Sequence, residues 1–242
     1  MWSFDETRVF AVSGLDLRVV EGGWPFAERN KAEIDARWQA RTRENPAFFN
    51  GVIHLLTEFS LDGGVLSGRF IPAEFKSFLY WRETGHADQT VMDAFGSGLI
   101  LSSDDRMLLG RQRAGNLNSG LCYPPGGFID GRDVRPDGRI DIEGSVAREI
   151  FEETGLAAPA FERAGDYVVT IAGPSLSIAV PYRASLGGAA LIDAVRAHIA
   201  SDPGGELADV LLVDPGEQPV AAPMPAYAQA LLSRFAELKI LA

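Results

Sequence analysis

Short apolar runs separated by polar segments dominate the first 88 residues, a pattern typical of strands with helices between them. The runs Thr7–Val12 and Leu15–Val20 predict two strands. The polar stretch from Pro25 to Glu44 predicts one helix, with proline in its first turn and Asn45-Pro46 after its end. The beginning of the chain is therefore expected to mix strands and a helix.

A hairpin and an aromatic helix complete this region. Ile53–Phe59 and Val65–Ile71 flank Leu61-Asp62-Gly63-Gly64, which is a strong hairpin signal. The following segment, Ala73–Arg82, predicts a helix rich in aromatic residues. Its aromatic side chains favour core packing, with a base-stacking platform as the alternative.

From about residue 90 the pattern becomes strand, hairpin, loop, helix and strand. The expected elements are strands at Ala94–Leu101 and Met107–Arg111, a loop over 114–127, a helix at Asp141–Thr154, strands at Asp166–Ala172 and Leu176–Tyr182, a helix at Ala189–Ala200, a strand at Asp209–Val213 and a helix at Tyr227–Leu238. This order predicts an α+β protein, with helices packed against the faces of a mixed sheet.

Composition narrows the classes of function. The chain has 242 residues, with 22 Lys and Arg against 33 Asp and Glu, which gives a formal net charge of −11. This balance argues against a nucleic-acid backbone as the partner. The single cysteine, Cys122, excludes an internal disulfide and a cysteine zinc cage, and favours a cytoplasmic location. We see neither a signal peptide nor an apolar stretch long enough to cross a membrane, so no membrane partner is expected.

The most informative segment is an acidic helical turn. Glu149, Glu152 and Glu153 are spaced i, i+3 and i+4, so their carboxylates project from one side of a helix. They repel one another near a helix C-terminus, where the macrodipole also disfavours anions. A divalent cation with oxygen ligands would compensate, and Mg²⁺ or Mn²⁺ suits carboxylates better than zinc does. The alternative is a solvated charged face, with Arg148 holding Glu152 four residues later.

This helix and the loop before it resemble the Nudix box, whose pattern is G-x5-E-x7-R-E-U-x-E-E-x-G-U with U aliphatic. The second half of the pattern matches at every specified position: Arg148, Glu149, Ile150, Glu152, Glu153, Gly155 and Leu156. In the first half Asp133 stands where the family has glutamate, and Gly127 and Arg148 are 21 positions apart instead of 14. The extra residues include the turn signal Pro136-Asp137-Gly138, so they are expected to form a surface loop before an N-cap at Asp141.

The resemblance implies a Nudix fold, an α/β/α sandwich around a mixed sheet, over residues 89–242. Residues 1–88 would then be an N-terminal α+β region preceding it. The implied activity is metal-dependent hydrolysis of the diphosphate in a nucleoside diphosphate linked to another moiety. The resemblance makes Glu149, Glu152, Glu153 and the Gly127 carbonyl ligands of Mg²⁺ or Mn²⁺, and gives Arg148 the task of orienting a glutamate.

Three further residues are candidates for the site. Glu206, after Pro203-Gly204-Gly205, is a candidate general base, with an exposed loop glutamate as the alternative. Arg111 and Arg113 are candidates for binding substrate phosphates through bidentate hydrogen bonds, and surface charge is the alternative. Cys122 is expected to be packed, because no histidine lies near it in the sequence.

The N-terminal region adds a hint about the substrate. Ile34 and Trp38, followed by Asn45-Pro46 and Phe49-Asn50-Gly51, resemble the region before the Nudix domain of eukaryotic UDP-sugar hydrolases. A UDP-sugar, cleaved to UMP and a sugar 1-phosphate, is therefore the first substrate hypothesis. ADP-ribose or coenzyme A is the alternative within the same chemistry. A Nudix-fold nucleotide sensor without activity and a structural α+β module remain the other classes, and the oligomeric state, a homodimer included, stays open.

Overall fold

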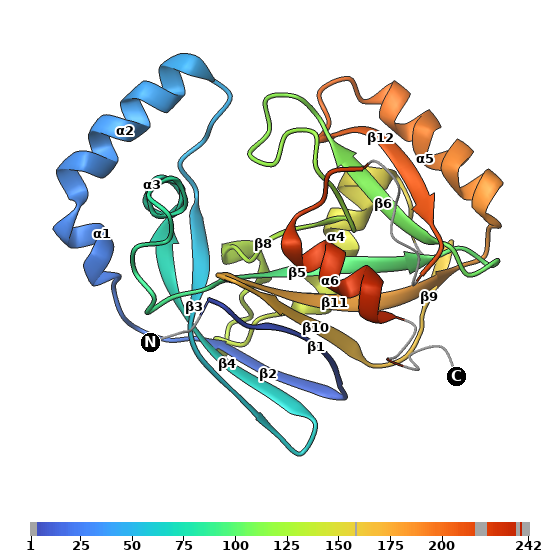
Figure 1. Cartoon of the computed structure of the whole chain (residues 1–242), viewed down its shortest axis with the longest axis horizontal. Helices are drawn as coiled ribbons and strands as arrows, with labels where there is room; N and C mark the ends of the chain where they lie inside the picture. The colour runs from blue at the N-terminus through green and yellow to red at the C-terminus, as the bar shows by residue number, and fades with distance from the viewer. Residues whose placement is uncertain (1–3, 158, 216–221, 236–237, 239–242) are drawn as a thin grey trace.

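The computed structural model describes residues 4–157, 159–215, 222–235 and 238, which form two sheets with helices packed on them (Figure 1). In chain order the elements are β1 (Thr7–Val12), β2 (Gly14–Val19), α1 (Pro25–Arg29), α2 (Lys31–Glu44), β3 (Val52–Asp62), β4 (Val65–Glu74), α3 (Phe75–Glu83), β5 (Asp93–Leu101), β6 (Met107–Gln112), β7 (Cys122–Tyr123), β8 (Gly126–Phe128), the 3₁₀ turn η1 (Gly131–Asp133), α4 (Ile142–Thr154), β9 (Phe161–Arg163), β10 (Tyr167–Ala172), β11 (Ser175–Ala184), α5 (Gly188–Ser201), β12 (Leu207–Val213) and α6 (Ala226–Arg234).

The larger sheet is mixed. Its strands follow the order β1-β10-β11-β5-β6-β12, with β7, β8 and β9 paired at β6, β5 and β11. Among these pairs β11 and β5 run parallel, from Ser175 opposite Asp93 to Arg183 opposite Leu101, and the others are antiparallel. The predicted α+β class with a mixed sheet is confirmed.

Helices cover both faces of this sheet. Ile100 of β5 belongs to the core that contains α4 and α5, whereas Leu99 and Leu101 belong to the core that contains α6. This alternation follows from the strand itself, because successive side chains point to opposite faces. The result is a layered arrangement of helices, sheet and helix, as the sandwich prediction requires.

The smaller sheet has the order β2-β4-β3 and shares a buried core with α1 and α3, while α2 packs on α3 (Figure 1). The predicted hairpin is present, since Asp62 pairs with Val65 around two glycines with φ of 54° and 78°. Isolated bridges from Ile53 to Asp130 and from Leu56 to Met92 join this sheet to the rest of the fold.

The boundary predicted at residue 88 stays a prediction, but two features cross it. Strand β1 lies in the larger sheet, where Thr7 pairs with Ala172. Phe70 from β4 lies in the same buried core as Val146 from α4. The N-terminal region therefore shares its core with the remainder of the chain.

Some predicted elements differ from the observed ones. The single helix expected over 25–44 is two helices, because Asn30 leaves helical geometry and its side chain donates to the Phe26 carbonyl at 2.7 Å. The loop expected over 114–127 contains β7 and the start of β8. The last predicted helix ends at Arg234, and residues 236–237 of that prediction lie outside the described residues.

None of the helices that the structure describes is both long and apolar enough to span a membrane.

Candidate active site

Helix α4 lies unusually close to strand β5. A Cβ atom at Gly98 would be 2.6 Å from Ile150 Cδ1, and one at Gly96 would be 2.8 Å from Val146 Cγ2. Any larger residue at these two positions would push the helix away from the sheet. Val146 and Ile150 are fully buried as predicted, and they hold the acidic side of α4 in one orientation.

Both ends of α4 are capped as the sequence predicts. The Asp141 carboxylate accepts a hydrogen bond from the Gly144 N–H at 3.1 Å. At the other end Gly155 adopts the left-handed conformation with φ of 70°, which glycine favours. Helix α4, which carries the acidic turn, therefore begins and ends at defined residues.

The three glutamates of this turn differ in burial. Glu149 and Glu153 are buried, whereas the side chain of Glu152 is 51% exposed. Burial is the main cause that raises the pKa of Glu149 to about 7, and the negative charge of Glu152 adds to it. The predicted metal site therefore contains two buried carboxylates, Glu149 and Glu153, whose negative charge the surrounding cations do not fully balance.

Glu153 is the most deeply buried of the three. Its Oε1 accepts a hydrogen bond from the Gly126 N–H at 2.9 Å, and no hydrogen bond of normal length reaches Oε2 from the described residues. Burial raises the pKa of Glu153 well above its usual range, and Glu206 and Glu149 raise it further, while the Gly126 N–H and the Gln112 amide oppose the shift. Glu153 Oε2 is therefore free to bind a ligand from outside the chain.

Gly127 lies directly against Glu149. A Cβ atom there would be 2.7 Å from both the carboxyl carbon and Oε2 of Glu149. Only glycine leaves this carboxylate in place, which gives a local reason for the glycine pair before the helix. Its neighbour Gly126 is equally constrained, because its Cβ would be 2.3 Å from the Gly96 carbonyl oxygen.

Arg148 forms different contacts from those that helical spacing suggests. The expected pair with Glu152 is absent from the ion pairs of the described residues; instead the Arg148 guanidinium donates to Asp133 Oδ1 at 2.8 Å and lies 3.5 Å from Glu149 Oε1. Arg132 is the cation nearest Glu152, at 3.8 Å. Arg148 can therefore orient Glu149, and its own position depends on Asp133.

Asp133 is a structural anchor despite its departure from the family pattern. Its side chain is fully buried, and Oδ2 accepts a hydrogen bond from the Asp130 N–H at 2.9 Å. The residues inserted after it form the predicted surface turn, with Gly138 at φ of 78°. In that turn Val134 bridges to Ile140, which brings the chain back to the start of α4.

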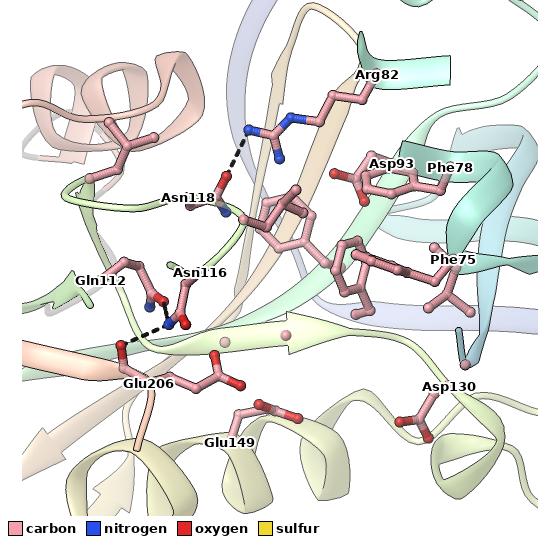
Figure 2. A pocket seen from close by; sticks show the side chains of 18 of the residues that line it. Phe75, Phe78, Arg82, Asp93, Gln112, Asn116, Asn118, Asp130, Glu149 and Glu206 are labelled. Carbon is pink, nitrogen blue, oxygen red and sulfur yellow. Dashed lines mark hydrogen bonds between the residues drawn. The ribbon is translucent and has the colours of Figure 1, made fainter. Parts of the chain in front are cut away.

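Glu206 lies near the glutamates of α4, although it is distant in sequence. Figure 2 shows its carboxylate close to that of Glu149 at one side of the pocket, and the negative charge of Glu206 raises the pKa values of Glu149 and Glu153. Glu206 is exposed on the loop before β12 and lines the pocket, and partial desolvation of its carboxylate, followed by the charge of Glu152, raises its pKa. A raised pKa makes a carboxylate a stronger base, so Glu206 is placed to accept a proton at this side of the pocket.

Arg113 supports Glu206 through backbone contacts. Its guanidinium donates to the Gly205 carbonyl at 2.7 Å and to the Leu207 carbonyl at 2.6 Å. Its own N–H donates to the Glu206 carbonyl at 2.8 Å. The Arg113 guanidinium is thus bonded to the carbonyls of the residues before and after Glu206, and Arg113 does not line the pocket.

Arg111 also lies outside the pocket lining. It is exposed on β6, next to Cys122 of β7. Cys122 is fully buried, as predicted. Phosphate binding by Arg111 and Arg113 stays a prediction that the geometry of this pocket does not favour.

A pocket of about 880 Å³ opens above α4 and extends toward α3. A volume of this order can hold a nucleotide-sized ligand. Phe75 and Phe78 of the aromatic helix line this pocket. Several other lining residues were not singled out by the sequence patterns: Arg82, Asp93, Gln112, Asn116, Asn118, Asp130 and Arg132. They come from α3, the start of β5, the end of β6 with the loop after it, and the segment around η1, and each was an unspecified position in the sequence patterns.

The donor set suits a hard divalent cation. The orphaned Glu153 Oε2, the raised pKa of Glu149 and the carboxylates of Glu152 and Glu206 provide oxygen ligands with excess negative charge. Within the described ranges no three Asp, Glu, His or Cys side chains already converge as a ready metal cage. Side-chain adjustment would therefore accompany metal binding at Glu149, Glu152 and Glu153.

Comparisons with known proteins give only distant likenesses. No protein-family model matches the chain, and none of the curated proteins matches it. Among solved structures it is similar to a Nudix hydrolase from M. smegmatis, RenU, at 17% identity and a TM-score of 0.39, over 60% of this chain and 82% of that one. It is also similar to a MutT protein from Methanosarcina mazei, at 22% identity and a TM-score of 0.37, over 60% and 94% of the two chains.

A third likeness is to Shewanella oneidensis NrtR in complex with a 27mer DNA, at 24% identity and a TM-score of 0.38, over 59% of each chain. These values are too low to support a conclusion about activity. The site's own geometry has to carry that conclusion.

Proposed function

We propose that this chain is a Nudix-type hydrolase that uses Mg²⁺ or Mn²⁺ to cleave the diphosphate of a nucleoside diphosphate linked to another moiety. The observation that carries the proposal is the buried carboxylate of Glu149, which lines a nucleotide-sized pocket together with Glu152 and Glu206 and has the buried Glu153 on the same side of α4. The mutual repulsion of these carboxylates is not balanced by the cations of the described residues. A divalent cation together with a diphosphate would supply both the charge and the ligand that this arrangement lacks.

Each residue of the site has a distinct task in this proposal. Glu149, Glu152 and Glu153 would hold the cation, which when bound neutralises diphosphate oxygens and lowers the pKa of water. Arg148 holds Glu149 in place, and Gly127 leaves room for it. Glu206 would accept the proton of the attacking water, since its raised pKa strengthens it as a base.

The N-terminal region supports a substrate with a large second moiety. Asn45, Phe48 and Phe49 line the pocket together with the residues of α3. The Asn45 side chain donates to the Gly115 carbonyl at 2.8 Å, which ties this segment to the loop on the other side. A UDP-sugar yielding UMP and a sugar 1-phosphate is the substrate we propose first. A small molecule as the partner and a cytoplasmic location stay predictions of the sequence.

A substrate panel tests the proposal. UDP-glucose, ADP-ribose, NADH, coenzyme A and 8-oxo-dGTP are incubated with the full chain and Mg²⁺ or Mn²⁺, and released mononucleotide is measured. We expect UMP and glucose 1-phosphate from UDP-glucose, and no product when EDTA removes the metal. Preferential cleavage of ADP-ribose or coenzyme A would change the substrate but keep the reaction. Binding without any cleavage would contradict the hydrolase and favour a nucleotide sensor.

A further inference from the structure

The pocket has a second polar end, away from the glutamates of α4. In Figure 2 Asp93 and Arg82 lie on one side of the pocket, and Glu149 and Glu206 lie on the other. Asp93 is the first residue of β5, and its N–H donates to the Pro174 carbonyl at 2.9 Å. The backbone of this residue is therefore held by the sheet while its side chain lines the pocket.

The Asp93 carboxylate has no partner among the described residues. Its Oδ1 atom is buried and accepts no hydrogen bond, and no ion pair includes this side chain. Arg82 is the cation whose charge acts on it, yet the Arg82 guanidinium donates to the Asn118 side chain at 2.8 Å. A buried acceptor left in this state destabilises a folded protein unless a ligand satisfies it.

Aromatic rings surround this end of the pocket. Phe78 and Phe75 come from α3, and both contact the ring of Phe128 edge-on, at centroid distances of 5.0 and 5.8 Å. Phe95 of β5 contacts the Tyr227 ring at 4.9 Å. Apolar walls with one strong acceptor between them suit a ring that presents N–H or O–H groups at its edge.

We propose that Asp93 is a specificity-determining residue that accepts hydrogen bonds from the ring carried by the diphosphate. The assignment rests on the proposed function, because it assumes that the diphosphate binds beside the glutamates of α4 and that the ring binds beside Asp93. The ring's donors can be the N–H groups of a nucleobase or the hydroxyls of a sugar. Arg82 and Asn118 act as positioning residues, since their hydrogen bond joins α3 to the loop after β6, and both residues line the pocket with Asp93.

Binding of substrate halves without metal tests this assignment. Calorimetric titrations in EDTA use UMP, AMP, glucose 1-phosphate and galactose 1-phosphate against the wild type, Asp93→Asn, Asp93→Ala and the surface control Asp137→Asn. We expect one class of probe to bind the wild type and the control equally, and to lose about 10- to 100-fold in affinity in both Asp93 variants, as for a lost charge-assisted hydrogen bond. Loss confined to the nucleotides identifies the base, and loss confined to the sugar phosphates identifies the sugar.

Two results would overturn the assignment: no binding of any probe to the wild type, or unchanged affinity in the Asp93 variants. Because the titrations need neither metal nor cleavage, they are independent of the hydrolase proposal. If a substrate of the panel is cleaved but the Asp93 variants bind the probes as well as the wild type does, the assignment of Asp93 is wrong and the hydrolase proposal stands. If the Asp93 variants lose affinity for a probe but no substrate of the panel is cleaved, the hydrolase proposal is wrong and the assignment of Asp93 stands.

Thermal unfolding of Asp93→Asn gives an independent measurement. Burial raises the pKa of Asp93 from its ordinary 3.8 to about 7 in the folded protein, and Arg82 opposes the shift. The charged carboxylate therefore destabilises the fold increasingly as the pH rises from 3.8 toward 7, and fully above that. Asp93→Asn should raise Tm more at pH 8 than at pH 5.

The other titratable groups around Asp93 are the same in the two proteins. Burial raises the pKa of Tyr227 well above its usual range and the charge of Asp93 adds to it, so Tyr227 stays protonated at pH 5 and pH 8 in both proteins. Burial and the charge of Arg82, not Asp93, lower the pKa of His86, which lines the same pocket. The pH dependence of the difference between the two proteins therefore reports on Asp93. Equal Tm changes at the two pH values would mean that the carboxylate is already compensated, and would overturn the assignment.

Discussion

Replacing Glu153 with glutamine is expected to lower kcat by about 10²- to 10³-fold, the range seen when one group that stabilises transition-state charge is removed. The same variant should have a higher Tm than the wild type, because burial and the neighbouring glutamates raise the pKa of Glu153 and make its charge unfavourable in the fold. We expect activity to fall and stability to rise together when the carboxylate that is removed is a metal ligand. Steady-state kinetics with Mg²⁺ and thermal unfolding at pH 8 measure the two effects.

Glu152→Gln and Glu143→Gln provide the comparison. Glu152 is half exposed, so its variant should lose a similar factor in kcat with little change in Tm. Glu143 is on the same helix but pairs with Arg163 away from this pocket, so its variant should keep its activity. Full activity in both Glu152→Gln and Glu153→Gln would refute the proposed role of the α4 turn.

Replacing Arg148 with methionine should give the largest loss of stability, about 3–5 kcal/mol in the free energy of unfolding. Its guanidinium is 2.8 Å from Asp133, whose side chain is fully buried, so the variant leaves an uncompensated charge inside the protein. Activity should also fall, because the same guanidinium lies 3.5 Å from Glu149 Oε1. Urea unfolding at neutral pH gives the free energy directly.

A matched variant separates burial from charge removal. Arg135 pairs with Asp141 at 3.0 Å, but both side chains are exposed, at 55% and 36%. Arg135→Met should therefore cost about 1 kcal/mol or less. Equal losses for the two arginines would contradict the view that Asp133 and Arg148 form a buried anchor of the site.

Local sequence signals predicted α4 and its surroundings well. The capping residues Asp141 and Gly155 and the buried side chains Val146 and Ile150 depend on neighbours within a few residues, so spacing along the chain is enough to recognise them. The hairpin of β3 and β4 is local for the same reason. Of these elements, α4 carries the part of the site that resembles the Nudix box.

Long-range packing accounts for what the sequence could not show. Strand β1 does not pair with β2, the next strand in the sequence, but with β10. This pairing depends on residues more than 150 positions away, which local patterns do not identify. Asp93 has no motif around it and becomes notable only when α3 and α6 enclose it. Arg113 illustrates the converse, because its spacing suggested phosphate binding, whereas the fold engages its side chain with the backbone around Glu206.

Binding of Mn²⁺, followed by electron paramagnetic resonance, tests most directly whether the α4 turn holds a divalent cation. The wild type should bind Mn²⁺ saturably, and the triple variant Glu149→Gln, Glu152→Gln, Glu153→Gln should lose that binding while remaining folded. The result needs no knowledge of the substrate. Equal Mn²⁺ binding by the two proteins would contradict the metal site, and the hydrolase proposed from it.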